Sequence, residues 1–373
     1  MNRKAFSRTA LAAATLMLVS SPVAASSLTL QPGITVQPTL TYTTVAAITS
    51  HLTGGSYTGV GSLFVEVAST ATTGLGYLCT GSLLSSNVVI TAGHCLSGTD
   101  EAGNSDPVKS VTFFLPSYGQ QTAPSTFTAT NWQVSPTYTG DPTQGGDFAL
   151  FTLGTKTSGY DTYSIYNGNP LRAFTRVGTG TIGGPQGTDT GGVADDYAQR
   201  SGRNLYEYNG DLVDGWSHNI LLSDFDDGTA QHDVFGRLLG APGRQTGIIG
   251  ESDSSPGDSG GPEFIDGKIV AVTSFGISGD AFRTVPLCGL PNSIDPYGDG
   301  GTTGVPANIA GCTNSSVGEL AGDTWLRPYE GYIDSYVRSA VPEPATWGML
   351  VGGFGLTGAS LRLRRRSART AVA

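Results

Sequence analysis

The chain has 373 residues, of which 13% are charged and 38% hydrophobic, with 54 glycines and a formal net charge of -10. This length allows one large or two ordinary domains, and the acidic balance disfavours nucleic acid and anionic lipid as partners. The abundance of Gly, Thr and Ser is typical of a secreted β-rich protein rather than a helical one.

The first 25 residues have the pattern of a secretory signal peptide. Three basic residues within the first eight precede an apolar run over residues 9–19, and small residues follow up to Ala25. We therefore expect cleavage after Ala25 rather than a buried helix. Residues 26–56 are rich in Thr and Pro, which indicates a pro-segment or a flexible arm.

Helical periodicity is nearly absent between residues 30 and 325. Short runs rich in β-branched and aromatic residues recur there with turn residues between them, which predicts an all-β sandwich or barrel. Two long stretches, residues 187–246 and 277–321, interrupt this rhythm, and connections of such length usually serve recognition or contain structure of their own. The predicted strands are residues 62–67, 82–92, 108–115, 129–134, 147–153, 175–180, 247–250, 261–265 and 268–274.

Residues 325–339 are the one good helix candidate. Five apolar or aromatic side chains share one face of this segment, namely Tyr329, Tyr332, Ile333, Tyr336 and Val337. We expect this helix to pack on the barrel and close it.

The C-terminal tail, Val341 to Ser367, contains Pro342-Glu343-Pro344, an apolar stretch of about 17 residues and then four arginines. Such a segment stops in the inner membrane with its basic end in the cytoplasm. The tail resembles the PEP-CTERM sorting signal of Gram-negative bacteria. This resemblance implies an exosortase-type enzyme as a partner, transient anchoring in the inner membrane, and a final location at the cell surface or in the extracellular matrix. Without both ends, 12 basic residues face 29 acidic ones, a net charge of about -17 that favours a soluble monomer.

Four cysteines, Cys79, Cys95, Cys288 and Cys312, lie in the part that we expect to be exported. An even number in an oxidising compartment favours two disulfides, and of the three possible pairings the one between sequence neighbours joins Cys79 to Cys95 and Cys288 to Cys312. No C-x-x-C spacing occurs and the four histidines are scattered, so we expect no metal centre and no cofactor. The acids of D-F-D-D-G at 224–228 could bind Ca²⁺, but the other ligands of a known loop pattern are missing and a solvated turn is preferred.

Three short motifs contain residues suited to acyl transfer. His94 follows a predicted strand in T-A-G-H-C, Asp147 opens one in D-F-A-L, and Ser259 lies in D-S-S-P-G-D-S-G-G-P. Taken singly, each is more often a structural residue. Together they follow the chain order His, Asp, Ser. A serine nucleophile needs a base and two backbone N–H donors for the oxyanion, and the N–H groups of Gly257 and Ser259 could supply the donors.

These motifs resemble those of the trypsin/chymotrypsin-like serine proteases. Further similar blocks are V-A-V-T-S-F-G at 270–276 and L-R-P-Y-E-G-Y-I at 326–333. The resemblance implies two six-stranded antiparallel β-barrels with a C-terminal helix, in a protease domain over residues 57–340 with insertions near 187–246 and 277–321. It also implies a secreted serine endopeptidase that acts on protein or peptide substrates.

The resemblance gives each motif residue a role. Ser259 would be the nucleophile, His94 the general base, and Asp147 the group that orients the imidazole, while Gly257 and Ser259 would form the oxyanion hole. The alternative for the whole chain is a catalytically silent protein of the same fold that serves as a binding or matrix protein at the cell surface.

Asp253, six residues before the nucleophile, would lie at the floor of the specificity pocket. Ser274 and Gly276 would lie on the neighbouring strand and line the pocket, which Gly276 would leave open. A carboxylate in this position implies cleavage after Arg or Lys. The alternative for Asp253 is one more acid in a polar loop.

The chain departs from the family pattern at several points. Ser255 stands where the family has a cysteine, so the serine loop must be held by other contacts. No I-V-G-G segment precedes Gly59, and the usual N-terminal partner of the aspartate before the nucleophile, here Asp258, is therefore not visible. Two alternatives follow: Asp258 pairs with another group, or the mature N-terminus lies at a cleavage site that the sequence does not reveal. Residues 277–321 would lie at the rim of the specificity pocket, and we expect them to form a lid.

Overall fold

The computed structural model describes residues 27–34, 36, 41–44, 56–68, 75–99, 105–116, 124–188, 198–240, 248, 251–284, 287–297, 309–340, 354, 356 and 357. The predicted signal peptide, nearly all of the predicted sorting tail and most of the predicted strand 247–250 lie outside these residues. The site and both β-sheets lie within them.

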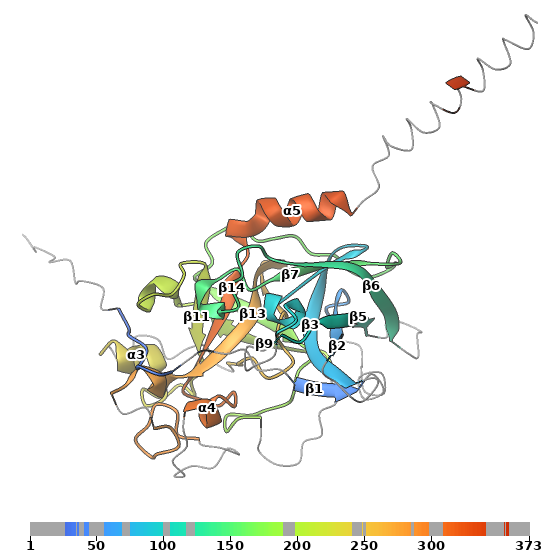
Figure 1. Ribbon diagram of the computed structural model, residues 1–373. Helices are drawn as coiled ribbons and strands as arrows, with labels where there is room; N and C mark the ends of the chain where they lie inside the picture. The colour runs from blue at the N-terminus through green and yellow to red at the C-terminus, as the bar shows by residue number, and fades with distance from the viewer. Residues whose placement is uncertain are drawn as a thin grey trace, which may run out of the picture.

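Seven strands form the first sheet, and six of them close into an antiparallel barrel (Figure 1). The hydrogen-bonded order is β1-β3-β2-β5-β6-β7-β4, and the additional pairing of β3 with β4 closes the ring. Its core is formed by inward-facing residues such as Leu63, Val65, Phe113 and Phe151. The strands are β1 (Thr41–Thr44), β2 (Val60–Val67), β3 (Leu75–Ser85), β4 (Val88–Thr91), β5 (Val108–Leu115), β6 (Ser125–Val134) and β7 (Ala149–Leu153).

The second sheet also has seven strands, in the order β10-β11-β14-β13-β12-β8-β9, and forms a half-barrel. Three of its strands lie within the stretch 187–246, which therefore has structure of its own. The prediction of an all-β fold with a six-stranded antiparallel barrel and a C-terminal helix is confirmed, and the second expected barrel is a half-barrel of seven strands. The strands are β8 (Ala173–Gly178), β9 (Arg200–Leu205), β10 (Tyr208–Asn209), β11 (Ile220–Asp224), β12 (Pro262–Ile265), β13 (Lys268–Ser278) and β14 (Glu319–Trp325).

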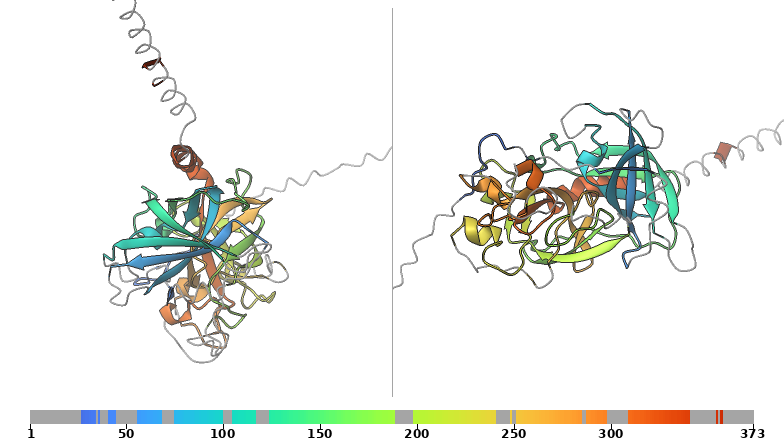
Figure 2. Two further views of the ribbon diagram at one scale, coloured as in Figure 1. Left: turned by 90° about the vertical axis from the view of Figure 1, so that its right-hand side faces the viewer. Right: turned by 90° about the horizontal axis from the view of Figure 1, so that it is seen from below.

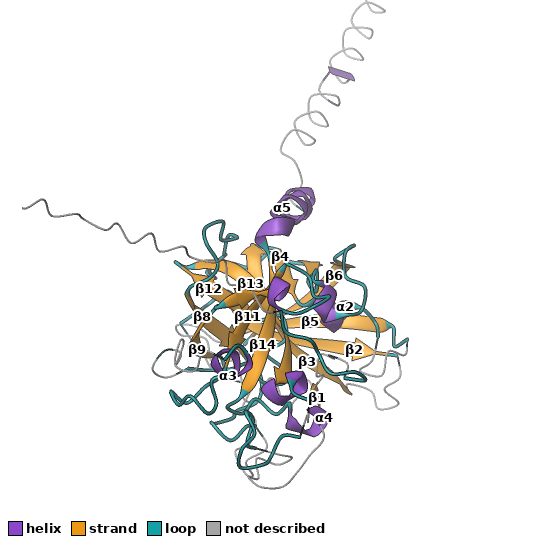
Figure 3. Cartoon of the chain, turned by 90° about the vertical axis from the view of Figure 1, so that its left-hand side faces the viewer, coloured by secondary structure: helices purple, strands orange, loops and turns teal. Residues whose placement is uncertain are grey.

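Short helices surround the strands, as Figure 3 shows. The α-helices are α2 (Gly93–Leu96), α3 (Val234–Leu238), α4 (Ile309–Cys312) and α5 (Glu330–Ser339), and the 3-10 turns are η1 (Pro142–Gln144), η2 (Gly210–Leu212), η3 (Gly279–Phe282) and η5 (Arg327–Tyr329). The predicted C-terminal helix is thus a 3-10 turn followed by α5. Pro328 is accommodated because the first helical turn does not require its missing N–H.

An apolar layer joins the two sheets, and α5 covers it. The first barrel contributes Ile90 and Phe148, the second sheet Val272, and the C-terminal segment Ile333 and Tyr336. Figures 1 and 2 show α5 lying along one side of both sheets. The side chain of Asn87 also donates to the carbonyl of Ala340 at 3.1 Å. The C-terminal helix therefore packs against both sheets and stabilises their contact.

The described parts of the predicted N-terminal arm pack on the domain. The amide of Leu28 donates to Leu212 at 2.7 Å, and the amide of Asp214 donates to Leu28 at 2.8 Å. Leu28 and Val36 are buried in the core of the second sheet, and β1 extends the first one. Leu28 is thus fixed beside η2.

Candidate active site

A disulfide between Cys79 on β3 and Cys95 on α2 fixes the turn that carries His94. This turn follows β4 directly, so the apolar strand delivers the histidine to the boundary between the sheets. A Cβ at Gly93 would lie 3.0 Å from Asp147 Oδ1, so glycine allows the close approach of the two segments. The second disulfide joins Cys288 to Cys312.

His94 and Asp147 form a buried, oriented pair. His94 Nδ1 lies 2.8 Å from Asp147 Oδ2, and the amide of His94 donates to Asp147 Oδ1 at 2.7 Å. Because an ionised carboxylate only accepts, this contact places the ring hydrogen on Nδ1 and makes Nε2 the acceptor. The hydroxyl of Ser274 on β13 donates to Asp147 Oδ2 at 2.5 Å. Ser274, expected at the substrate pocket, thus also holds the aspartate.

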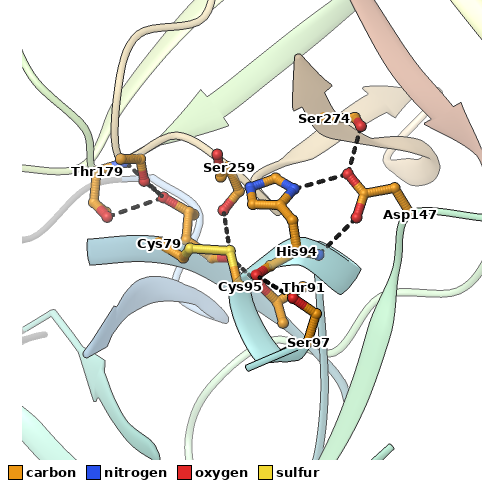
Figure 4. Close-up of a disulfide and its surroundings, with 11 residues drawn as sticks. Cys79, Thr91, His94, Cys95, Ser97, Asp147, Thr179, Ser259 and Ser274 are labelled. Carbon is orange, nitrogen blue, oxygen red and sulfur yellow. Dashed lines mark hydrogen bonds and ion pairs between the residues drawn. A yellow bond between two sulfur atoms is a disulfide. The ribbon is translucent and has the colours of Figure 1, made fainter. Parts of the chain in front are cut away.

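Ser259 lies beside the imidazole. Figure 4 shows the ring of His94 between Ser259 and Asp147. His94 Nε2 is buried and has no hydrogen-bond partner among the described residues, and no hydrogen bond joins it to Ser259. Such catalytic contacts are often long in free enzymes and shorten when substrate binds. The structure thus brings His94, Asp147 and Ser259 together from three separate segments.

The loop before the serine leaves two amides unused. Gly257 has φ +98° and Gly260 φ +80°, a region that favours glycine. A Cβ at Gly257 would also lie 2.8 Å from Leu78 Cδ2. The amides of Asp258, Gly260 and Gly261 donate within the chain, whereas those of Gly257 and Ser259 bond to no other described residue. Two neighbouring free N–H groups beside a serine could stabilise an oxyanion.

Comparison with known protein families gives two matches. Residues 53–201 match the family model described as Trypsin. The chain contains a trypsin-family domain. Residues 340–366 match the PEP-CTERM protein-sorting motif. The Trypsin match includes His94 and Asp147 and ends before Ser259, and no curated protein shows a significant match to the chain. No helix of the described residues is both long and apolar enough to cross a membrane.

A cavity of about 40 Å³ lies next to Ser259. Asp253, Ser274 and Gly276 line it, and the stretch 277–321 contributes Thr313, Ser315 and Glu319. The sequence did not suggest Glu319, which is buried and whose pKa is raised well above its ordinary value by burial and then by Asp295 and Asp253. The lid function of 277–321 stays a prediction.

Asp253 has an internal partner that the sequence did not reveal. Arg176 on β8 is buried and contacts three carboxylates: Asp253 at 3.4 Å, Glu263 at 3.2 Å and Asp323 at 2.6 Å. Burial raises the pKa of Asp253 to about 6, although the Arg176 guanidinium opposes this shift. One cation therefore serves three acids, and Asp253 is neither an exposed loop acid nor free of a counter-charge.

The residues at the two departures from the family pattern bond to each other. Asp258 Oδ2 accepts from the amide of Ser255 at 2.9 Å and lies 3.0 Å from its hydroxyl. Asp258 Oδ1 accepts from the amide of Gly180 at 2.8 Å. The carboxylate for which the sequence offered no partner is thus bonded within the domain.

A larger cavity of about 870 Å³ lies behind the serine loop, where Asp258, Ser255 and Asp253 line part of its wall. Asp226 and Glu251 also line it. The solvated turn expected at 224–228 is wrong for two of its acids, because Asp224 and Asp226 are 2% and 5% exposed. Asp224 ends β11 and accepts from the amide of Val234, so the strand carries its carboxylate inward.

Replacing Glu207, beside these acids, by Gln is expected to raise the melting temperature by about 3 °C at pH 8.5, or roughly 1 kcal/mol in a domain of this size. Burial, then Asp233 and Glu251, raise the pKa of Glu207 to about 8. The folded state therefore binds its proton more tightly than the unfolded state, and stability falls as pH rises from about 4.5 to 8. Glutamine removes this loss. Thermal melts from pH 4.5 to 8.5 measure it.

Glu66→Gln on β2 is the matched control, since Glu66 lies in the first barrel, where it accepts from Ser110. The difference between Glu207→Gln and wild type should shrink to zero near pH 4.5. If the difference in melting temperature between Glu207→Gln and wild type is the same at every pH, the raised pKa of Glu207 is contradicted.

Proposed function

We propose that the protein is a secreted serine endopeptidase that cleaves peptide bonds through His94, Asp147 and Ser259. The observation that carries this proposal is the buried pair of His94 and Asp147, in which Nε2 of the imidazole bonds to no described residue. Ser259 lies beside it, and the amides of Gly257 and Ser259 bond to no other described residue. This geometry supports acyl transfer, and membership of the trypsin family makes a peptide the expected substrate.

In the proposed reaction, Ser259 Oγ attacks the carbonyl carbon of the scissile bond while His94 Nε2 takes its proton. The amides of Gly257 and Ser259 would donate to the oxyanion, and removal of one such donor typically costs about 3 kcal/mol. The imidazolium then protonates the leaving amine, which yields an acyl-enzyme. Water, deprotonated by the same His94, releases the acid product. Asp147 keeps the ring oriented and stabilises its cation throughout.

A fluorophosphonate probe tests the proposed nucleophile. The probe should form one adduct, on Ser259, which peptide mass spectrometry can locate, and a peptide substrate should slow the labelling. Protein that is folded but unlabelled, and that cleaves no member of a peptide library, would instead favour the catalytically silent binding or matrix protein.

We further propose that the substrate residue before the scissile bond is Arg or Lys. Asp253 and Glu319 line the pocket beside Ser259. Asp253 shares Arg176 with Glu263 and Asp323, so three carboxylates outnumber one guanidinium. A substrate cation beside Asp253 would add a second positive charge to this cluster of acids.

Asp253→Ser is expected to lower kcat/KM for an Arg substrate by about 10²-fold, the usual range for loss of one partner of a buried charge pair. An otherwise identical Leu substrate should be nearly unaffected. Because the pKa of Asp253 is about 6, the preference for Arg over Leu in the wild type should also decline as pH falls through 6. Asp266→Ser, at an exposed acid, is the control. An unchanged Arg preference in Asp253→Ser would refute the pocket assignment.

A further inference from the structure

We infer that Ser255 and Asp258 position the serine loop for catalysis, so that the protease needs no free N-terminal amine to align its oxyanion donors. This inference rests on the proposed function and adds two positioning residues to it. Asp258 directly precedes Ser259, and its carboxylate accepts from the amides of Gly180 and Ser255. Both of its oxygens are therefore engaged inside the domain.

The end of β8 provides a cradle for this carboxylate. A Cβ at Gly178 would lie 1.9 Å from Asp258 Oδ1, and one at Gly180 would lie 2.8 Å from the same oxygen. Neither position could hold a side chain unless Asp258 moved. Two glycines thus leave space for the aspartate, and the amide of Gly180 fixes it there.

Ser255 ties the start of the loop to the same segment. Its hydroxyl lies 2.6 Å from the carbonyl of Thr181 as well as 3.0 Å from Asp258, so its single hydrogen is shared between two acceptors. The amide of Thr181 in turn donates to the carbonyl of Pro256 at 2.9 Å. These bonds join the segment that follows β8 to the serine loop. They take the place of the disulfide that the family's cysteine at this position would form.

Thr80 on β3 fixes the loop from the other barrel. Its hydroxyl donates to the carbonyl of Gly257 at 3.0 Å, and its amide donates to the carbonyl of Ser259 at 2.8 Å. With both carbonyls held, the peptide planes between them have little freedom to rotate. The amides of Gly257 and Ser259 are therefore preset, which matters because a displacement of about 1 Å at a catalytic group can cost 10² in rate.

The N-terminal segment is anchored elsewhere. Leu28 bonds to Leu212 and Asp214, and the amide of Gln31 donates to Ala281 at 3.1 Å. Cleavage after Ala25 would leave the new amine within about 7 Å of Leu28, the reach of two residues. None of the described residues from 27 to 36 lines the cavity that Asp258 borders. An amine created by that cleavage would thus lie beside η2.

The first test compares two forms of the full protease domain, one starting at Ser26 and one carrying extra residues upstream. We expect their kcat/KM values for a peptide substrate to agree within about twofold, since an activating amine would be lost in the extended form. An extended form that is inactive until the extra residues are removed would overturn the inference, while the proposed function would stand.

The second test examines the loop itself. Ser255→Ala is expected to lower kcat by about 10–10²-fold, by displacement of the oxyanion donors, with KM nearly unchanged. Affinity for a peptide boronate, which needs those donors, should fall in parallel, whereas affinity for the product peptide should not. Ser255→Thr, which keeps the hydroxyl, should restore kcat. Asp258→Asn should lower kcat by at least as much as Ser255→Ala.

Thr181→Val is the matched control, because the hydroxyl of Thr181 has no partner among the described residues and only its main chain holds the loop. Full kcat in Ser255→Ala, or equal losses in Ser255→Ala and Thr181→Val, would overturn the positioning role. If neither form of the wild type cleaves peptides or reacts with fluorophosphonate, the proposed function itself fails, and the inference fails with it.

Discussion

Replacing Ser259 by alanine is expected to lower kcat for peptide hydrolysis by about 10⁶-fold, the size of effect that loss of a serine nucleophile has in this type of mechanism. The hydroxyl of Ser259 bonds to no other described residue, so its removal should leave the fold intact. The measurement is single-turnover hydrolysis of a fluorogenic peptide, with thermal melts to show that the variant remains folded.

His94→Ala should cost a similar factor, and the double variant should be no slower than either single one, because the two side chains act as one unit. Ser254→Ala, five residues earlier in the same loop, is the control and should retain kcat within about tenfold. A Ser259→Ala variant with comparable activity would require another nucleophile and would exclude the proposed mechanism.

Replacing Arg176 by methionine is expected to destabilise the domain by about 3–5 kcal/mol, since it leaves buried carboxylates without their cation. Burial lowers the pKa of Arg176, but Asp323, Glu263 and Asp253 more than offset this and keep it above its ordinary value. The guanidinium is therefore charged at any pH at which the protein folds. Urea unfolding at pH 8 measures the loss, which corresponds to a fall of roughly 10 °C in melting temperature.

The loss in Arg176→Met should be smaller at pH 5, because protonated acids no longer repel one another. Arg172→Met is the matched control, since Arg172 pairs with Asp266 at the surface with half of its side chain exposed, and exposed pairs contribute about 0–1 kcal/mol. Equal losses in the two variants would contradict the central place of Arg176 in the charge cluster.

The site residues that the sequence revealed are those with a local signature. His94 follows an apolar strand beside a cysteine, and Ser259 lies among glycines whose positive φ only glycine readily adopts. Arg176 has no such signature, because its partners Asp253, Glu263 and Asp323 come from three other segments. The pairing of β8 with β12 sets Arg176 opposite Glu263, and the pairing of β13 with β14 places Asp323 in the same sheet.

The strands that hydrophobic periodicity did not predict also depend on contacts with segments distant in the sequence. β9 has the sequence R-S-G-R-N-L, which lacks an apolar alternation, and it is a strand because all six of its residues pair with β8. The predicted strand 82–92 is instead the hairpin of β3 and β4. Its turn depends on the hydroxyl of Ser85, which accepts from the amides of Asn87 and Val88. Tertiary pairing and a polar turn thus outweigh local propensity in both places.

The position of α5 after all the described strands determines when the apolar layer between the sheets can be covered. Among the described residues, the buried members of the first barrel's core lie between Leu63 and Leu153, so this core can form early in synthesis. The layer between the sheets needs Ile333 and Tyr336, which are synthesised after all the described strands. A truncated or stalled chain would therefore present a folded barrel next to an uncovered apolar face. Chaperones and proteases bind such exposed apolar faces, so a chain without α5 should be degraded faster than the complete chain.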